Sequence, residues 1–105
     1  MSAEERWTTW FSEEDRAEMR LVGEGNTILD FSVQYLAQIE RQWYPIVRFD
    51  TAHGRAHMDI SRPDGTQETV PLPSEAGYAD VFDMAVEDIH RRWQFYRERY
   101  LRWRG

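Results

Sequence analysis

The stretch that most constrains the fold is WYPIVRFDTAHGRAHMD, residues 43–59. Apolar and polar residues alternate on each side of a turn signal at residues 51–54. Alternation with a period of two is typical of a strand that buries one face. A tight turn would pair Asp50 with Arg55, and the stretch therefore predicts two antiparallel strands. Their apolar face carries Val47, Phe49, Ala56 and Met58, and their polar face carries Arg48, Asp50, Arg55, His57 and Asp59.

A preceding strand is predicted over residues 28–39, where the odd-numbered positions are apolar from residue 31 onward. A three-residue loop after this strand pairs Tyr35 with Val47 and Ile39 with Trp43. Each pair then places one apolar residue opposite another. A slip of one residue would turn every side chain to the wrong face, so the apolar faces match only for a loop with an odd number of residues.

Proline residues indicate where two of the predicted strands begin or end. A proline has no amide to donate to a strand ladder, so we expect a bulge near Tyr44-Pro45 or a strand that begins at Ile46. The segment Pro63-Asp64-Gly65 is a turn signal, because Pro fixes φ and Gly accepts a positive φ. This turn predicts a last strand in which Val70 lies opposite Met58.

Residues 1–16 carry mixed signals. Trp7, Trp10 and Phe11 are spaced i, i+3 and i+4, which favours one face of a helical turn. Ser12 precedes three acidic residues, a pattern typical of a helix N-cap. We therefore expect a short N-terminal helix or an irregular arm, followed by a strand near residues 17–22.

One long helix is predicted over residues 76–103, where apolar side chains recur at steps of three and four. Ser74 is the expected cap, and acidic residues lead while arginines trail, which suits the helix dipole. A helix of this length is about 42 Å long, whereas a seven-residue strand spans about 23 Å. We therefore expect the last turns, with Tyr100 and Trp103, to overhang the sheet.

Together these elements predict an α+β fold, an antiparallel meander of four or five strands with one long C-terminal helix packed on one face. The 105 residues are expected to form a single domain. Its parts are an N-terminal arm (1–16), a β-meander (17–73) and a C-terminal helix (74–105). Surplus aromatic residues predict an interface with a second copy or a small protein partner, formed by Trp7, Trp10, Phe11, Tyr100 and Trp103.

The composition limits the partners. The net charge of −6 argues against general nucleic-acid binding. Six arginines and Glu98 give residues 91–105 a charge of +5, so nucleic acid is expected only through residues 91–104. All thirteen basic residues are arginine, a bias that a GC-rich genome explains without any function.

The sequence also limits the compartment. The absence of cysteine excludes disulfides and thiolate metal sites. No apolar stretch approaches the ~20 residues of a membrane span, and the N-terminus lacks the pattern of a signal peptide. We therefore expect a cytoplasmic protein that does not contact a membrane.

The polar residues of the 43–59 stretch are the candidate catalytic residues: Arg48, Asp50, His53, Arg55, His57 and Asp59. They can form a structural ion-pair network. Alternatively, the two histidines can serve as base and acid in phosphodiester cleavage, with the arginines as cations. A bound metal is a third reading. The spacing Asp-x2-His-x3-His-x-Asp is no specific metal signature, so we expect no metal and no cofactor.

The same stretch resembles a family of short prokaryotic proteins of unknown function. The shared pattern is Trp-Tyr-Pro at 43–45, Arg-aromatic-Asp at 48–50 and His-Gly at 53–54, then His57 and Asp59. The likeness covers residues 28–73, and it departs where Glu40-Arg41-Gln42 replaces an expected glycine. Over a shorter motif, the Arg-x-Asp strand before a histidine also resembles TumE-type toxins of toxin–antitoxin pairs.

Two functions follow as hypotheses. The first is a non-enzymatic module that assembles with itself or with a small partner through its surplus aromatic surface. The second is a small ribonuclease-like toxin that acts through the polar face of the central hairpin. Whether the protein is an enzyme stays open at this point.

Overall fold

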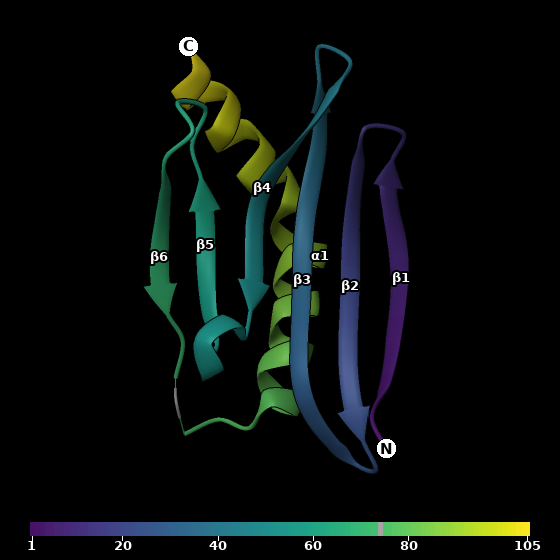
Figure 1. The fold of residues 1–105 in the computed structure, drawn as a ribbon. Helices are drawn as coiled ribbons and strands as arrows, with labels where there is room; N and C mark the ends of the chain where they lie inside the picture. The colour runs from purple at the N-terminus through teal and green to yellow at the C-terminus, as the bar shows by residue number, and fades with distance from the viewer. Residues whose placement is uncertain (74) are drawn as a thin grey trace.

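The computed structural model describes the backbone of residues 1–73 and 75–105, and their side chains except that of His53. Within this part of the chain, six strands form one antiparallel sheet in sequential order, and one long helix crosses one face of it (Figure 1). The predicted α+β meander with a C-terminal helix is confirmed, and the expected four or five strands are too few. The elements are β1 (Ala3–Ser12), β2 (Asp15–Glu24), β3 (Thr27–Ile39), β4 (Gln42–Asp50), the 3₁₀-helix η1 (Ala52–Gly54), β5 (His57–Ser61), β6 (Gln67–Pro71) and α1 (Tyr78–Arg104).

The extra strand is β1, so the predicted N-terminal helix or irregular arm is wrong. Trp7 pairs with Met19 of β2, and the ladder continues toward Ser12. Trp7 contacts Phe82 of α1, whereas Trp10 lies on the other face of the sheet against Trp43. Aromatic residues on both faces of a strand hide the period of two, and their spacing then imitates a helical turn.

The β3–β4 connection is a two-residue turn, not the predicted three-residue loop. Glu40 and Arg41 both have positive φ, 52° and 71°, as a type I′ hairpin turn requires. Ile39 therefore lies opposite Gln42 rather than Trp43, and an irregularity on β4 restores the predicted pair of Tyr35 with Val47. Ile46 is the extra residue, one position beyond the bulge predicted at Tyr44-Pro45.

The β4–β5 register differs from the prediction by two residues. Asp50 lies opposite His57, and Arg55 lies outside the strands. Since two residues are a full period of a strand, the shift leaves every side chain on its predicted face. The pair of Met58 with Val70 in the β5–β6 hairpin is confirmed.

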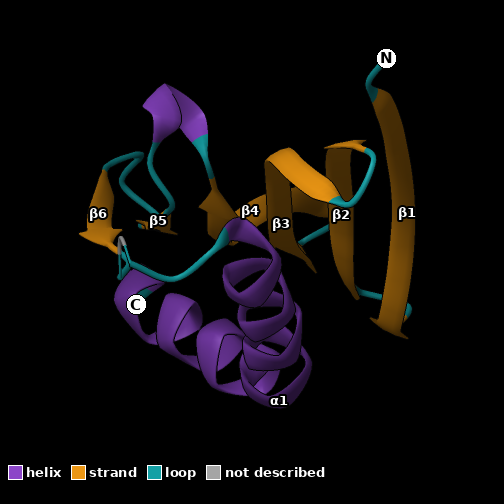
Figure 2. Ribbon diagram, turned by 90° about the horizontal axis from the view of Figure 1, so that it is seen from below, coloured by secondary structure: helices purple, strands orange, loops and turns teal. Residues whose placement is uncertain are grey.

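The helix begins at Tyr78, with Gly77 as its N-cap, close to the predicted start. The predicted Ser74 cap lies outside the described residues. Helix α1 packs on β3 and β4, and β1 stands to one side of it (Figure 2). None of the helices in the described part of the chain is apolar enough, over a sufficient length, to cross a membrane.

The helix buries one stripe against the sheet, and its last turns do not overhang. Tyr100 is 5 % exposed and its ring lies near that of Tyr44. Trp103 lies beneath the guanidinium of Arg62, at 4.3 Å from the ring centroid. The thirteen residues of β3 span roughly 43 Å, and the twenty-seven of α1 about 40 Å. The long β3–β4 hairpin therefore reaches the end of the helix.

A buried ion pair ties the helix to the sheet. Arg97 of α1 donates to Asp15 Oδ1 at 2.8 Å, and the Tyr35 hydroxyl donates to the same oxygen at 2.5 Å. The Ser12 hydroxyl donates to Asp15 Oδ2 at 2.6 Å. Asp15 is 4 % exposed, so one carboxylate joins β1, β2, β3 and α1.

We expect Asp15→Ala to lower the free energy of unfolding by about 3 kcal/mol, because the variant removes the carboxylate shared by the Tyr35 hydroxyl and the partly buried Arg97 guanidinium, and the Glu14 carboxylate lies farther from Arg97, at 3.9 Å. Tyr35→Phe removes one hydroxyl and should cost only about 1 kcal/mol. Urea denaturation of both variants measures the difference. Equal losses in the two variants would contradict the central role of the carboxylate.

Candidate functional site

Four of the predicted site residues converge on the open face of the sheet, opposite α1. Arg48 and Asp50 come from β4, and His57 and Asp59 from the neighbouring β5. The Arg48 guanidinium pairs with Asp50 Oδ2 at 2.7 Å. His57 Nε2 lies 2.8 Å from Asp50 Oδ1 and 3.4 Å from Asp59 Oδ2. The polar face predicted from alternation therefore contains one connected network, which we call the β4–β5 cluster.

The imidazole of His57 is fixed on both sides. Its Nδ1 lies 3.1 Å from the backbone carbonyl of Arg55, which can only accept a hydrogen bond. Nδ1 therefore donates, and Nε2 points at the two carboxylates. Both ring nitrogens are thus occupied within the chain.

The two carboxylates are buried although they belong to the open face. Asp50 is 5 % exposed and Asp59 is 9 % exposed. The amide of Ala52 donates to Asp50 Oδ1 at 3.1 Å, and the hydroxyl of Thr69 donates to Asp59 Oδ1 at 2.8 Å. Burying carboxylates is costly unless donors or cations compensate them, and each of these groups has such partners.

The two other predicted site residues do not join the cluster through described side chains. Arg55 lies in the connection before β5, where its carbonyl orients His57 while its side chain is exposed. The predicted pair of Asp50 with Arg55 is wrong. The connection between β4 and β5 contains η1 and is longer than the expected tight turn, so Asp50 lies opposite His57 instead. The side chain of His53 lies outside the described part of the structure.

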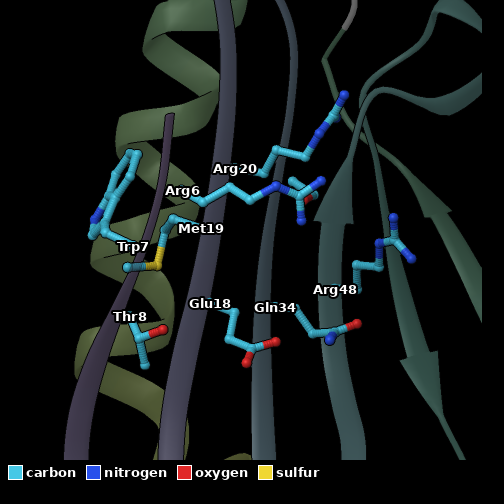
Figure 3. A pocket seen from close by; sticks show the side chains of 9 residues that line it. Arg6, Trp7, Thr8, Glu18, Met19, Arg20, Gln34 and Arg48 are labelled. Atoms are coloured by element: carbon cyan, nitrogen blue, oxygen red, sulfur yellow. The ribbon is translucent and has the colours of Figure 1, made fainter. Parts of the chain in front are cut away.

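Strands β1 and β2 extend the open face and add residues that the sequence analysis missed. A shallow hollow of about 370 Å³ is lined by Arg6, Glu18, Arg20, Gln34 and Arg48, among others (Figure 3). Alternation in residues 3–12 would have revealed Arg6 if the segment had been recognised as a strand. The arginines here are balanced by acids, since Arg20 bonds Glu4 at 2.5 Å and Asp30 at 2.7 Å.

Asp30 connects this hollow to the end of β4. The Thr51 hydroxyl donates to its carboxylate, and the amide of Phe31 donates to the same hydroxyl oxygen at 3.0 Å. The Thr51 hydrogen bond, followed by that of Arg20, lowers the pKa of Asp30 below its ordinary value. The negative charge is thereby held in place between the two strands.

A second candidate surface lies on the helix side of the sheet. Because α1 covers β3 and β4, it leaves a groove of about 400 Å³ beside β1. Its walls are largely apolar and include Trp7, Phe11, Met19, Phe82 and Val86. We call it the β1 groove.

The predicted interface residues divide into two groups. Trp7 and Trp10 are 39 % and 55 % exposed, and Phe11 is half-buried with its ring stacked on Trp93. Tyr100 is buried within its own chain and is not available to a partner. Trp103 is 39 % exposed but packs with Arg62.

The basic C-terminal segment is largely neutralised inside the chain. Arg91 and Arg92 pair with acids one turn earlier on α1, Arg97 pairs with Asp15, and Arg104 pairs with Glu40. Nucleic-acid binding through residues 91–104 stays a prediction, with few free cations to support it.

The model of a family described as "Domain of unknown function (DUF7718)" matches residues 1–105. The expected likeness to a family of unknown function is confirmed at this level, and the likeness to TumE-type toxins stays a prediction. No curated protein and no solved structure matches the chain.

The low pKa of Asp30 gives a pH-dependent prediction. The folded state favours the carboxylate, so this contribution to stability is present above the ordinary pKa of 3.8 and is lost as the pH falls below it. Thr51→Val should raise the pKa of Asp30, as measured by NMR titration, whereas Thr51→Ser keeps the hydroxyl and should leave it low. Asp64, whose pKa is lowered by Thr66, is the internal control. An unchanged Asp30 in Thr51→Val would refute the assignment.

Proposed function

The chain belongs to the DUF7718 family, whose function is unknown, and we propose for it a non-enzymatic role as a self-assembly module that pairs β1 with β1 of a second copy. The observation that carries the proposal is the combination of an exposed edge strand with an apolar groove directly beside it. The second copy fits both features at once.

Strand β1 has the properties of a sheet edge open to pairing. It is the first strand of the sheet and pairs on one side only, with β2. Nine of its ten residues are exposed. An edge strand presents unpaired amides and carbonyls, and a long exposed edge invites another strand.

The sequence of β1 favours one register. Its charges lie within the first four residues, and the remaining six, Trp7–Ser12, are uncharged. If Thr9 lies on a two-fold axis, antiparallel pairing places Trp7 of one copy opposite Phe11 of the other. Glu4 and Glu5 then fall outside the paired segment. Aromatic pairs across strands are favourable, and within the paired segment, residues 6–12, this register places no like charges opposite each other.

The β1 groove supports the same arrangement. A two-fold axis perpendicular to the sheet keeps both helices on the same side, so the grooves of the two copies meet. Trp7 and Phe11 of the second copy would then close the open side of the groove, which Phe82 and Val86 line. The apolar walls are thereby removed from water, which is the main driving force of association.

The axis at Thr9 can be tested by charge. Thr9→Lys places two like charges opposite each other and should give a monomer, whereas the wild type should be a dimer by size exclusion with light scattering at about 100 µM. Ala3→Lys adds the same charge to the same strand outside the paired segment and should remain dimeric.

Mixing Thr9→Lys with Thr9→Glu should restore a dimer of mixed composition, because opposite charges then meet at the axis. A monomeric wild type, or a Thr9→Lys variant that still forms dimers, would refute the proposal. A dimer disrupted by Ala3→Lys as well would show that the register is wrong.

The second candidate, a small ribonuclease-like toxin, rests on the presence of Arg48 and His57 in one cluster on an open sheet face. A general acid or base needs a ring nitrogen free to exchange a proton with the substrate. Nδ1 of His57 donates to the Arg55 carbonyl and Nε2 is directed at the buried Asp50 and Asp59 of the same chain, so the geometry favours this function less.

We expect bacteria that express the wild type to grow as well as those that express His57→Ala, with intact RNA in both. Growth inhibition by the wild type that disappears in His57→Ala would instead establish the toxin. Western blotting for equal expression is the necessary control.

A further inference from the structure

We propose that Asp50, His57 and Asp59 bind a divalent first-row metal ion, such as Mn²⁺ or Zn²⁺. Each residue contributes one donor atom, and the three donor atoms lie within 4.8 Å of one another. This inference does not depend on the pairing of β1, because the β4–β5 cluster lies on other strands and on the opposite face from the β1 groove.

Two of the three separations between the donors are close to those around a single ion. Metal bonds of about 2.0–2.2 Å to nitrogen and oxygen hold neighbouring donors roughly 3–3.5 Å apart. His57 Nε2 lies 2.8 Å from Asp50 Oδ1 and 3.4 Å from Asp59 Oδ2. The donor atoms lie within 4.8 Å of one another, so the two carboxylates would approach each other slightly when an ion replaces these direct contacts.

Groups behind the donors hold them in this orientation. The Arg55 carbonyl accepts a hydrogen bond from Nδ1–H of His57, and this contact turns Nε2 toward the carboxylates. Thr69 bonds Oδ1 of Asp59, and Arg48 bonds Oδ2 of Asp50. In each carboxylate the other oxygen is the one nearest to Nε2. Such outer contacts are typical of histidine and carboxylate ligands in metal sites.

The charge of the cluster supplies an independent argument. Two carboxylates are buried here, and among the arginines that the structure describes, Arg48 is the one within ion-pairing distance of either. One arginine offsets one carboxylate, and the charge of the second buried carboxylate favours a further cation. A divalent cation compensates it.

One of the three donors, His57, borders a cleft that is open to solvent. A cleft of about 460 Å³ is lined by His57 and Thr69, together with Arg55, Pro71 and Leu72. Three protein donors leave positions on the ion for water or for a ligand entering from this cleft. Imidazole with carboxylates, and no sulfur, suits Mn²⁺, Fe²⁺ or Zn²⁺ better than a soft ion.

No metal was expected from the sequence, because the spacing Asp-x2-His-x3-His-x-Asp is no specific metal signature, and Asp50 was expected opposite Arg55. The observed register brings Asp50 opposite His57 instead. A shift of two residues thus changes a salt bridge between strands into a set of three converging donors.

The test uses full-length protein stripped with EDTA and titrated with Mn²⁺, with free Mn²⁺ followed by electron paramagnetic resonance. Calorimetry with Zn²⁺ is the second measurement. We expect one ion per chain in the wild type and at least about a tenfold loss of affinity in His57→Ala and in Asp59→Asn. His90→Ala removes a histidine of α1 outside the cluster and should bind as the wild type does.

Thr69→Val keeps all three donors and tests the orientation of Asp59 even if a ligand variant fails to fold; we expect affinity to fall about tenfold. Circular dichroism establishes that each variant is folded. A wild type that binds neither Mn²⁺ nor Zn²⁺, or a folded His57→Ala that binds with unchanged affinity, would overturn the proposal.

Discussion

The contact between Asp15 and Arg97 is the interaction on which the arrangement of sheet and helix depends. The two residues are 82 positions apart, and their ion pair joins the first hairpin to the far half of the helix. Most other pairings in the described sheet link neighbours in the chain, because the strand order is sequential. The meander can therefore form locally, and the buried carboxylate fixes where the helix finally lies. Tyr35, which is fully buried, donates to the same oxygen and ties β3 into this point.

The position of the helix creates both candidate surfaces. Because α1 packs on β3 and β4, one long flank of the sheet keeps its apolar face open beside β1. Helix α1 does not cover the opposite face, where the charged residues of β4 and β5 are compensated by one another and by Thr69. The packing of α1 on β3 and β4 thus places the β1 groove and the β4–β5 cluster on opposite faces of the sheet.

The alternation of side chains along a strand explains how much of the fold and of the β4–β5 cluster could be predicted from the sequence. Alternation assigned the faces of Arg48 and Asp59 correctly although the register was wrong, since an error of two residues preserves the face. The register depends on the length of the β4–β5 connection, and no sequence pattern in residues 51–54 indicated the 3₁₀-helix η1. The bulge at Ile46 was close to the prediction because Pro45 cannot donate to the ladder. Strand β1 was missed because Trp7 and Trp10 occupy opposite faces, and Asp15 was missed because its burial depends on a distant arginine.

The sequential strand order also sets a distance. The β4–β5 cluster lies between three and four strand spacings from β1, which is roughly 17 Å at about 4.8 Å per strand. In an assembly joined at β1, the two clusters would lie at the outer flanks, roughly 40 Å apart before twist is considered. The protein would then be bivalent, with two identical polar sites facing the same side. A ligand with two matching groups at that span would be held far more tightly than either group alone, because the second contact is intramolecular.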